Sequence, residues 1–219
     1  MKPPQRRAAR GRPPSITRER IIEAGIGMGL SDITFVGIAA ALGVSHMALY
    51  KHVAGLDELK RLVAEEIFNR WELPLADGSG GGGLKAYLQR FAASLQAFVK
   101  AHPGVTPYVI RRQAATRPML ARIDGHQRHI AEAYGLSLDR ARWLLATVAF
   151  HTLAVADTVY SVAGREPVVQ ADRATEEAAM EQELVQGLHA LIIGALALPE
   201  ENPPSSPADA AACGNIIGL

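Results

Sequence analysis

Apolar residues recur at spacings of three and four along almost the whole chain. Such spacing lines one face of an α-helix with apolar side chains, whereas a half-buried strand needs strict alternation. No run of alternating Val, Ile and Thr is present. The sequence therefore predicts an all-α protein of about nine helices. They are expected over about 17–28, 34–42, 45–53, 56–72, 84–101, 105–113, 118–134, 138–163 and 173–198.

Capping residues and glycines divide this pattern into segments. Thr17, Thr34 and Ser45 stand where helix N-caps are expected, and Gly43 follows the second helix, where a left-handed residue is favoured. A Gly-rich stretch over 74–83 is the main break. We expect a basic flexible arm over 1–15, a three-helix domain over 16–60, a larger helical domain over 61–198 and a disordered tail over 199–219.

Residues 34–53, TFVGIAAALGVSHMALYKHV, carry the most specific pattern. Two short helices can share a small core, with Ala39 where they cross and Gly43 at the turn. Two helices joined by a turn of about three or four residues form a helix-turn-helix, and an ordinary helical hairpin is the alternative. The expected core residues are Ile38, Leu42, Val44, Leu49 and Val53.

Polar residues of this segment fall mainly on its second helix. In a helix-turn-helix the second helix enters the major groove of DNA and its N-terminal residues meet base edges. Thr34 and Ser45, at helix starts, are placed to offer hydroxyl and N–H groups to phosphates, and capping alone is the simpler role. The outward polar residues are Ser45, His46, Tyr50, Lys51 and His52.

The stretch 34–53, followed by GLDEL at 55–59, resembles the DNA-binding domain of the tetracycline-repressor (TetR) family of bacterial regulators. The resemblance implies that Tyr50 binds a phosphate. It also implies that His46, Met47, Ala48 and Lys51 face base edges or the DNA backbone. Three features depart from the family: Leu56 replaces a frequent lysine, Val36 stands where an arginine sometimes reads a base, and the first helix is about one turn shorter.

Charge is unevenly distributed along the chain. Its formal net charge is only +1, yet residues 1–20 hold seven basic residues and one acidic residue, which gives 7 − 1 = +6. An anionic partner, nucleic acid or membrane, is expected at this end. Arg10 and Arg12 lie in a narrow Arg-Gly-Arg-Pro segment that could enter the minor groove of DNA. A solvated basic tail that raises only non-specific affinity is the alternative.

The resemblance implies that the last two long helices pair between subunits of a homodimer. A two-fold dimer presents two recognition helices about 34 Å apart and so matches an inverted-repeat operator. An apolar stripe on the last helix suits this pairing, and Gly187, Ala190 and Gly194 allow close approach. Packing inside one subunit is the alternative. The stripe consists of Met180, Leu184, Leu188, Leu191 and Ala195.

The resemblance also implies a pocket whose small-molecule ligand releases the operator, as in a ligand-responsive repressor. His151 and Asp157 are unusual in an otherwise apolar helix, although each could be a satisfied core or interface group. Trp143 and Phe150 are expected more as core residues than as ligand contacts. The candidate pocket residues are Tyr108, Arg111, His126, Trp143, Phe150, His151 and Asp157.

Other classes of protein fit less well. A small enzyme or metal-binding protein could use His126, His129 and His151, but the chain has no HExxH, GxSxG, P-loop or dinucleotide motif. No catalytic residue, metal or cofactor is therefore expected. The single cysteine fits a reducing compartment. The longest uncharged apolar run, over 143–156, is shorter than the ~20 residues that span a bilayer, so a cytoplasmic protein is expected.

Overall fold

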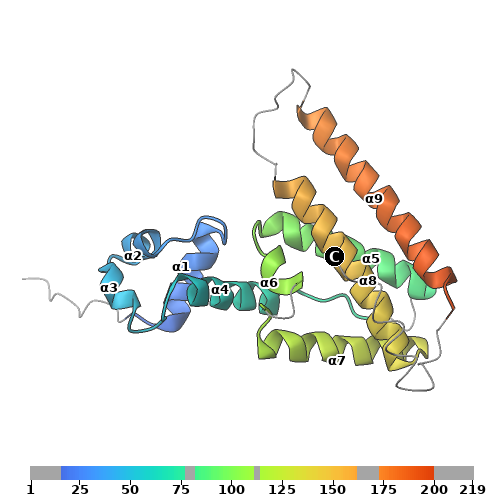
Figure 1. Ribbon diagram of the computed structural model, residues 1–219, viewed down its shortest axis with the longest axis horizontal. Coiled ribbons are helices and arrows are strands. Elements are labelled where there is room, and N and C mark those ends of the chain that lie inside the picture. Colours follow the sequence, from blue (N-terminus) through green and yellow to red (C-terminus); the bar gives the residue numbers. More distant parts are fainter. Residues whose placement is uncertain (1–15, 77–81, 111–113, 162–172, 200–219) are drawn as a thin grey trace, which may run out of the picture.

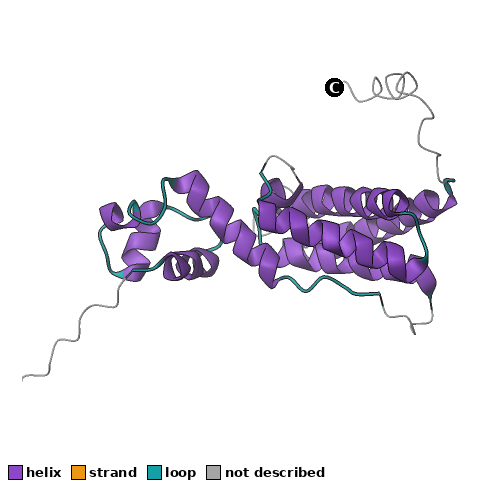
Figure 2. Cartoon of the chain, turned by 90° about the horizontal axis from the view of Figure 1, so that it is seen from below, coloured by secondary structure: helices purple, strands orange, loops and turns teal. Residues whose placement is uncertain are grey.

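The computed structural model describes residues 16–76, 82–110, 114–161 and 173–199, and within these ranges the chain forms nine helices and no strand (Figures 1 and 2). The all-α prediction is confirmed. The helices are α1 (Arg18–Met28), α2 (Phe35–Leu42), α3 (His46–Leu49), α4 (Leu56–Arg70), α5 (Gly83–Ala101), α6 (Thr106–Ile110), α7 (Arg117–Tyr134), α8 (Leu138–Ser161) and α9 (Arg173–Ala197). The predicted arm over 1–15 and all but the first residue of the predicted tail over 199–219 lie outside the described residues.

Helices α1 and α2 begin and end at the residues that the sequence indicates. The side chain of Thr17 accepts a hydrogen bond from the backbone N–H of Arg20, and that of Thr34 accepts one from Gly37. Gly43 ends α2 in the left-handed conformation, with φ 67°. A residue with a Cβ is strained there, so glycine allows the chain to turn directly into α3.

Helix α3 is shorter than expected, and its predicted cap is wrong. The side chain of Ser45 makes no capping hydrogen bond. The N–H of Ala48, which such a cap would receive, donates instead to the backbone carbonyl of Ser45 at 2.9 Å. After Leu49 the chain continues as a turn, in which His52 and Val53 both donate to the carbonyl of Leu49.

The first three helices lie at one end of the molecule (Figure 1), and with α4 they bury residues that belong to a core continuing into the rest of the chain. Of the five predicted core residues, Ile38, Leu49 and Val53 are buried, and Leu42 and Val44 are half-buried against them. Leu49 is fully buried, so it anchors α3 while the neighbouring side chains face outward.

Helix α1 crosses α4 at Gly25, which is buried. A Cβ added there would lie 2.5 Å from the Cγ2 atom of Val63 on α4.

We expect Gly25→Ala to lower the free energy of unfolding by about 1–3 kcal/mol, because the two helices must separate. Gly27→Ala on the same helix is the matched control. Nothing lies within 4 Å of its added Cβ, so it should stabilise by about 0.5–1 kcal/mol. Urea denaturation of both variants measures the difference, and equal stabilities would contradict the close crossing.

Helix α4 leads from this core to the larger helical body (Figure 1). It packs on α1, α6 and α7, and its last residue, Arg70, pairs with Glu23 of α1. The predicted domain division after residue 60 falls inside α4 and remains a prediction.

The larger body is built around α8, which packs against α5, α7 and α9. By length and composition alone, α8 is apolar enough to cross a membrane. Its contacts with these helices and with α6 account for much of that apolarity, because Leu144, Leu145 and Val148 are buried in the core. We therefore interpret α8 as a core helix.

The apolar stripe of α9 packs inside the subunit. Leu184, Leu188 and Ala195 are each 5% exposed, and α9 contacts α8 and α5. The expectation that this stripe forms the subunit interface is therefore wrong, because an amphipathic pattern shows that a face is buried but not which neighbour buries it. Gly187, Ala190 and Gly194 lie on exposed positions of the helix.

Candidate functional site

The predicted DNA-contacting residues around α3 face outward. Met47 and Tyr50, three residues apart, are 62% and 50% exposed, and Ala48 and His52 are half-buried. The other predicted positions in the described chain, Thr34, Ser45, His46 and Lys51, are also exposed. Arg10 and Arg12 lie outside the described residues. Most of the predicted DNA-contacting side chains of α2, α3 and the turn after α3 are therefore accessible to a partner.

Tyr50 is held by an aromatic neighbour that the sequence did not single out. Its ring stacks on that of Phe35, the first residue of α2, with centroids 4.7 Å apart and planes inclined by 24°. An aromatic pair of this kind restricts the ring while leaving its polar end in water. The phenol oxygen of Tyr50 is therefore positioned before any partner arrives.

Two exposed apolar residues stand on the same surface. Val36 follows Phe35 and is 71% exposed, and Met47 precedes Tyr50 by one helical turn. Neither side chain can donate a hydrogen bond to a base. The apolar group that a base presents in the major groove is the methyl of thymine, so these positions suit contact with A·T pairs.

Glu58 ties the turn after α3 to the start of α4. Its carboxylate accepts the backbone N–H of Ala54 at 2.5 Å and pairs with Arg18 of α1 at 3.2 Å. An acidic residue in the first helical turn also suits the positive end of the helix. This contact gives a structural reason for the acidic residues of the GLDEL stretch.

A second candidate site is a cavity of about 640 Å³ in the larger body. This volume lies in the range of small-molecule pockets. The wall is apolar and rich in aromatic rings from α4, α5 and α8. These rings belong to Phe68, Trp71, Phe91, Phe98 and Phe150. Trp71 stands at their centre, with its ring centroid 4.8 Å from that of Phe98 and 6.4 Å from that of Phe91.

His126 of α7 is a polar part of the cavity wall. Its Nε2 atom lies 2.7 Å from the hydroxyl oxygen of Tyr87, which is fully buried on α5. Burial, with smaller contributions from the nearby His129 and Arg122, lowers the pKa of His126 to about 4. Burial also raises the pKa of Tyr87 above its usual value. Both groups are therefore neutral at pH 7.

The depressed pKa of His126 makes stability depend on pH. Between pH 6.5 and about 4 the unfolded chain binds a proton that the folded chain does not, so stability falls as the pH is lowered through this window. We expect His126→Gln to flatten this dependence. Urea midpoints at pH 7 and pH 5 measure it. The pKa of His102 is also lowered by burial, and His102 affects the unsubstituted protein and the His126 variant alike. The test is therefore the difference between the pH dependences of the two urea midpoints. Parallel pH profiles would contradict it.

A carboxylate and a guanidinium complete the polar part of the wall. Asp124 of α7 and Arg142 of α8 pair at 2.8 Å, and Arg142 holds the pKa of Asp124 below its usual value. Each charge is therefore matched by the other. The pair also links α7 to α8 beside the cavity.

Arg122 joins the cavity to the end of α4. Its guanidinium donates to the backbone carbonyls of Phe68 and Trp71 and lies 5.5 Å from the centroid of the Phe68 ring. The last carbonyls of a helix lack partners within the helix, so a cation bonds them well. Because Phe68 and Trp71 also line the cavity, the final turn of α4 is shared between the cavity wall and α7.

The predicted pocket residues are not all brought together. His126 and Phe150 line the cavity, and half-buried Tyr108 is next to the lining residue Val109. Arg111 lies outside the described residues. Asp157 is half-buried and lines neither this cavity nor the α8–α9 groove.

Trp143 does not line the cavity and lies under the guanidinium of Arg140, 4.7 Å from its ring centroid. The expectation that Trp143 and Phe150 belong to the core is wrong, because they are 39% and 62% exposed. Phe150 lines the open cavity although it is mostly exposed, and Trp143 lines neither the cavity nor the α8–α9 groove.

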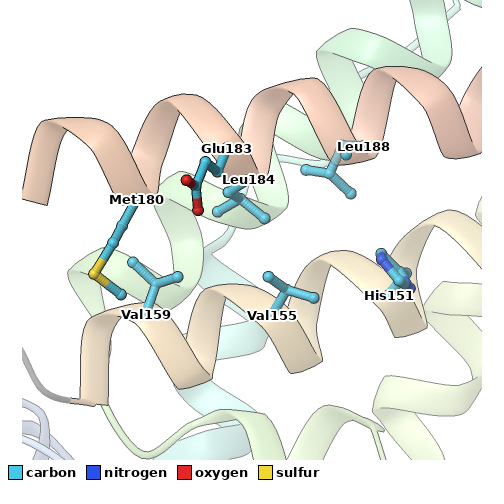
Figure 3. A pocket seen from close by; sticks show the side chains of 8 residues that line it. His151, Val155, Val159, Met180, Glu183, Leu184 and Leu188 are labelled. Carbon is cyan, nitrogen blue, oxygen red and sulfur yellow. The ribbon is translucent and has the colours of Figure 1, made fainter.

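His151 belongs to a separate, smaller groove of about 170 Å³ between α8 and α9 (Figure 3). Figure 3 shows Val155 and Val159 below Leu184 and Met180, with His151 further along α8. Of the three histidines of the alternative metal-site interpretation, His126 and His129 lie near each other on α7 and bond Tyr87 and the N–H of Ala76, whereas His151 lies in this separate groove. Within the described ranges, no three His, Cys, Asp or Glu residues gather as metal ligands would.

Known proteins share this fold. No protein-family model matches the chain. It is 35% identical over 102 residues to the HTH-type transcriptional repressor DrrR1 of Streptomyces coeruleorubidus. That alignment spans 45% of this chain and 37% of the relative.

Three solved structures cover most of the chain. ActR of Streptomyces coelicolor in complex with actinorhodin has a TM-score of 0.64 at 21% identity, covering 84% of this chain and 97% of that one. A single-residue variant of TetR from Acinetobacter baumannii AYE, in complex with minocycline, has a TM-score of 0.61 at 20% identity, covering 82% and 96%. BioQ of Mycobacterium smegmatis has a TM-score of 0.57 at 20% identity, covering 83% and 99%. In its all-α fold and in the residues around α2 and α3, the chain resembles the TetR family of transcriptional regulators.

Proposed function

We propose that the protein is a sequence-specific transcriptional repressor that binds an inverted-repeat operator as a homodimer and is released by a small molecule. The observation that carries the proposal is the outward-facing α3, anchored by buried Leu49 and flanked by the stacked Tyr50. A helix held in this way suits the major groove. Such a protein acts in the cytoplasm, where bacterial DNA lies, and needs no catalytic group.

The homodimer is supported by exposed apolar residues of α9. Val185 and Ile193 are 55% and 49% exposed. Large apolar side chains in water are candidates for burial in an interface, and the exposed glycines Gly187 and Gly194 would let another helix approach α9. A second copy that packs on α9 would bury apolar side chains outside the stripe that faces α8 and α5.

The effector is proposed to occupy the aromatic cavity. Its wall includes the last turn of α4, and the first turn of α4 is bonded through Glu58 to the turn after α3. If α4 has two positions, a ligand that fits the cavity in only one of them stabilises that position. The resulting change in operator affinity is limited by the ratio of the ligand's affinities for the two positions. The complexes of ActR with actinorhodin and of TetR with minocycline support a small-molecule effector.

Selection of bound fragments from genomic DNA tests the operator proposal. We expect enrichment of a site with two-fold symmetry, bound by two chains per duplex at a Kd of about 10⁻⁸ M or below. Screening of aromatic compounds against the purified complex should then find one that releases the DNA. A pure dimer that prefers no duplex over random sequence would contradict the proposed function.

The basic N-terminal segment provides a separate prediction. Removal of residues 1–14 takes away Lys2, Arg6, Arg7, Arg10 and Arg12. For every phosphate that the segment binds, its removal should reduce the slope of log affinity against log salt by about 0.9, because fewer counterions are released. Operator titrations between 50 and 200 mM salt (roughly the range over which this effect is large) measure the slope. An unchanged slope would mean that the segment binds no phosphate.

A further inference from the structure

The hydrogen bond between Tyr87 and His126 determines where the imidazole carries its proton. Tyr87 is fully buried, and its hydroxyl oxygen lies 2.7 Å from Nε2 of His126. A buried hydroxyl that only accepted a bond would leave its own proton unsatisfied, which is costly. The hydroxyl therefore donates to Nε2. Because a neutral imidazole has one N–H, that N–H is on Nδ1.

His126 lines the cavity, and with Nε2 bonded to Tyr87 the polar group that its ring has left for a ligand is the Nδ1–H, a donor and not an acceptor. Its charge state supports this: burial keeps the imidazole neutral near pH 7. The other polar groups of the wall discriminate less. Asp124 and Arg142 are paired with each other, and Gln127 can turn its amide to offer either a donor or an acceptor.

The rest of the wall sets the shape of what can bind. Phe68, Trp71, Phe91 and Phe98 line the cavity with apolar aromatic rings, and Trp71 lies close to two of the other rings. Stacking on several rings favours a planar aromatic molecule. A cavity of about 640 Å³ has room for a ligand with several fused rings.

We infer that His126 determines ligand specificity in this cavity, and that the effector is a planar aromatic compound whose carbonyl oxygen accepts the Nδ1–H of His126. The inference rests on the proposed function only in naming the ligand an effector. The hydrogen bond itself is a property of the cavity. A compound of the same shape without the carbonyl leaves this donor unpaired when it displaces water, and so binds less tightly.

Two water-soluble probes test the carbonyl directly: 9,10-anthraquinone-2-sulfonate and anthracene-2-sulfonate. They share three fused rings and one sulfonate, and differ in the two carbonyl oxygens. We expect isothermal titration calorimetry on the full-length protein to give at least about tenfold tighter binding of the quinone. Equal affinities, or failure of the quinone to bind, would overturn the inference.

Two substitutions distinguish the roles of the Nδ1 and Nε2 atoms of His126. His126→Gln can keep an acceptor for Tyr87 near the place of Nε2 and removes the Nδ1 donor, so it should fold and bind both probes equally. His126→Asn can keep a donor near the place of Nδ1, so it should retain part of the preference for the quinone. Preservation of the full preference in the Gln variant would overturn the role of His126. Nitrogen-15 NMR of the histidine ring gives a readout independent of ligand, and an N–H on Nε2 would also overturn it.

Operator release separates this inference from the proposed function. The same probes are added to the complex of the protein with its selected operator. If the quinone binds by calorimetry with the expected preference but operator affinity does not change, the cavity chemistry stands and the effector role fails. If both probes bind equally and both release the operator, the effector role stands and the assignment of His126 fails.

Discussion

Replacement of Tyr50 by alanine is expected to weaken operator binding by about tenfold to a hundredfold. The ring of Tyr50 is stacked and half exposed, and under the proposed function its hydroxyl bonds a phosphate oxygen; a hydrogen bond to a charged group contributes about 1.5–3 kcal/mol. Fluorescence anisotropy with the selected operator measures the loss. Size-exclusion chromatography and circular dichroism check that the dimer and its helices are intact.

Matched substitutions divide this effect between the hydroxyl and the ring. Tyr50→Phe keeps the stacking on Phe35 and removes only the oxygen, so it should lose most of the affinity that the alanine variant loses. Phe35→Ala keeps the oxygen and removes its support, so it should cause a smaller loss that Phe35→Tyr restores. Unchanged operator affinity in the alanine variant would contradict the placement of α3 in the groove.

Replacement of Arg122 by methionine is expected to uncouple the cavity from the DNA-binding helices. The arginine bonds the carbonyls of Phe68 and Trp71, and methionine keeps much of its apolar length without these bonds. Loss of the two bonds should lower the free energy of unfolding by about 2 kcal/mol. The effect of an effector on operator affinity should fall by about tenfold, which is within the usual range of coupling between sites.

Operator titrations with and without an effector, taken from the screen or from the quinone probe, measure the coupling. Urea denaturation measures the stability. Arg117→Met is the control, because Arg117 is exposed on the same helix. It should leave both quantities close to those of the unsubstituted protein. An Arg122 variant that keeps the full response to effector would show that α4 transmits the signal without this contact.

The features that the sequence predicted correctly depend on neighbours in the chain. Thr17 and Thr34 cap their helices because a hydroxyl reaches an N–H three residues away, and Gly43 makes a turn that needs only its own backbone freedom. The side chain of Ser45 does not cap α3 for an equally local reason, because the N–H of Ala48 donates to the backbone carbonyl of Ser45 instead. A short helix offers such alternatives, and periodicity alone does not resolve them.

The features that the sequence could not predict depend on contacts between distant segments. Trp71 and Phe98 meet only because the end of α4 reaches α5. The bonds of Arg122 go to backbone carbonyls, which any residue supplies, so no residue pattern marks them. The sequence showed the apolar stripe on α9. Packing on α8 and packing on a second subunit would require the same apolar residues, so the pattern could not distinguish them.

The crossing at Gly25 has a mechanical consequence for α4. With no Cβ between them, α1 and α4 pack closely at Gly25 and Val63, and we expect the two helices and the helices around α3 to move together when α4 tilts. From Phe68 back to Leu56, α4 is about 18 Å long. A tilt of α4 by about 3° about its cavity end would therefore move its first residue by about 1 Å. In a two-fold dimer the distance between the two α3 helices would change by up to twice that amount.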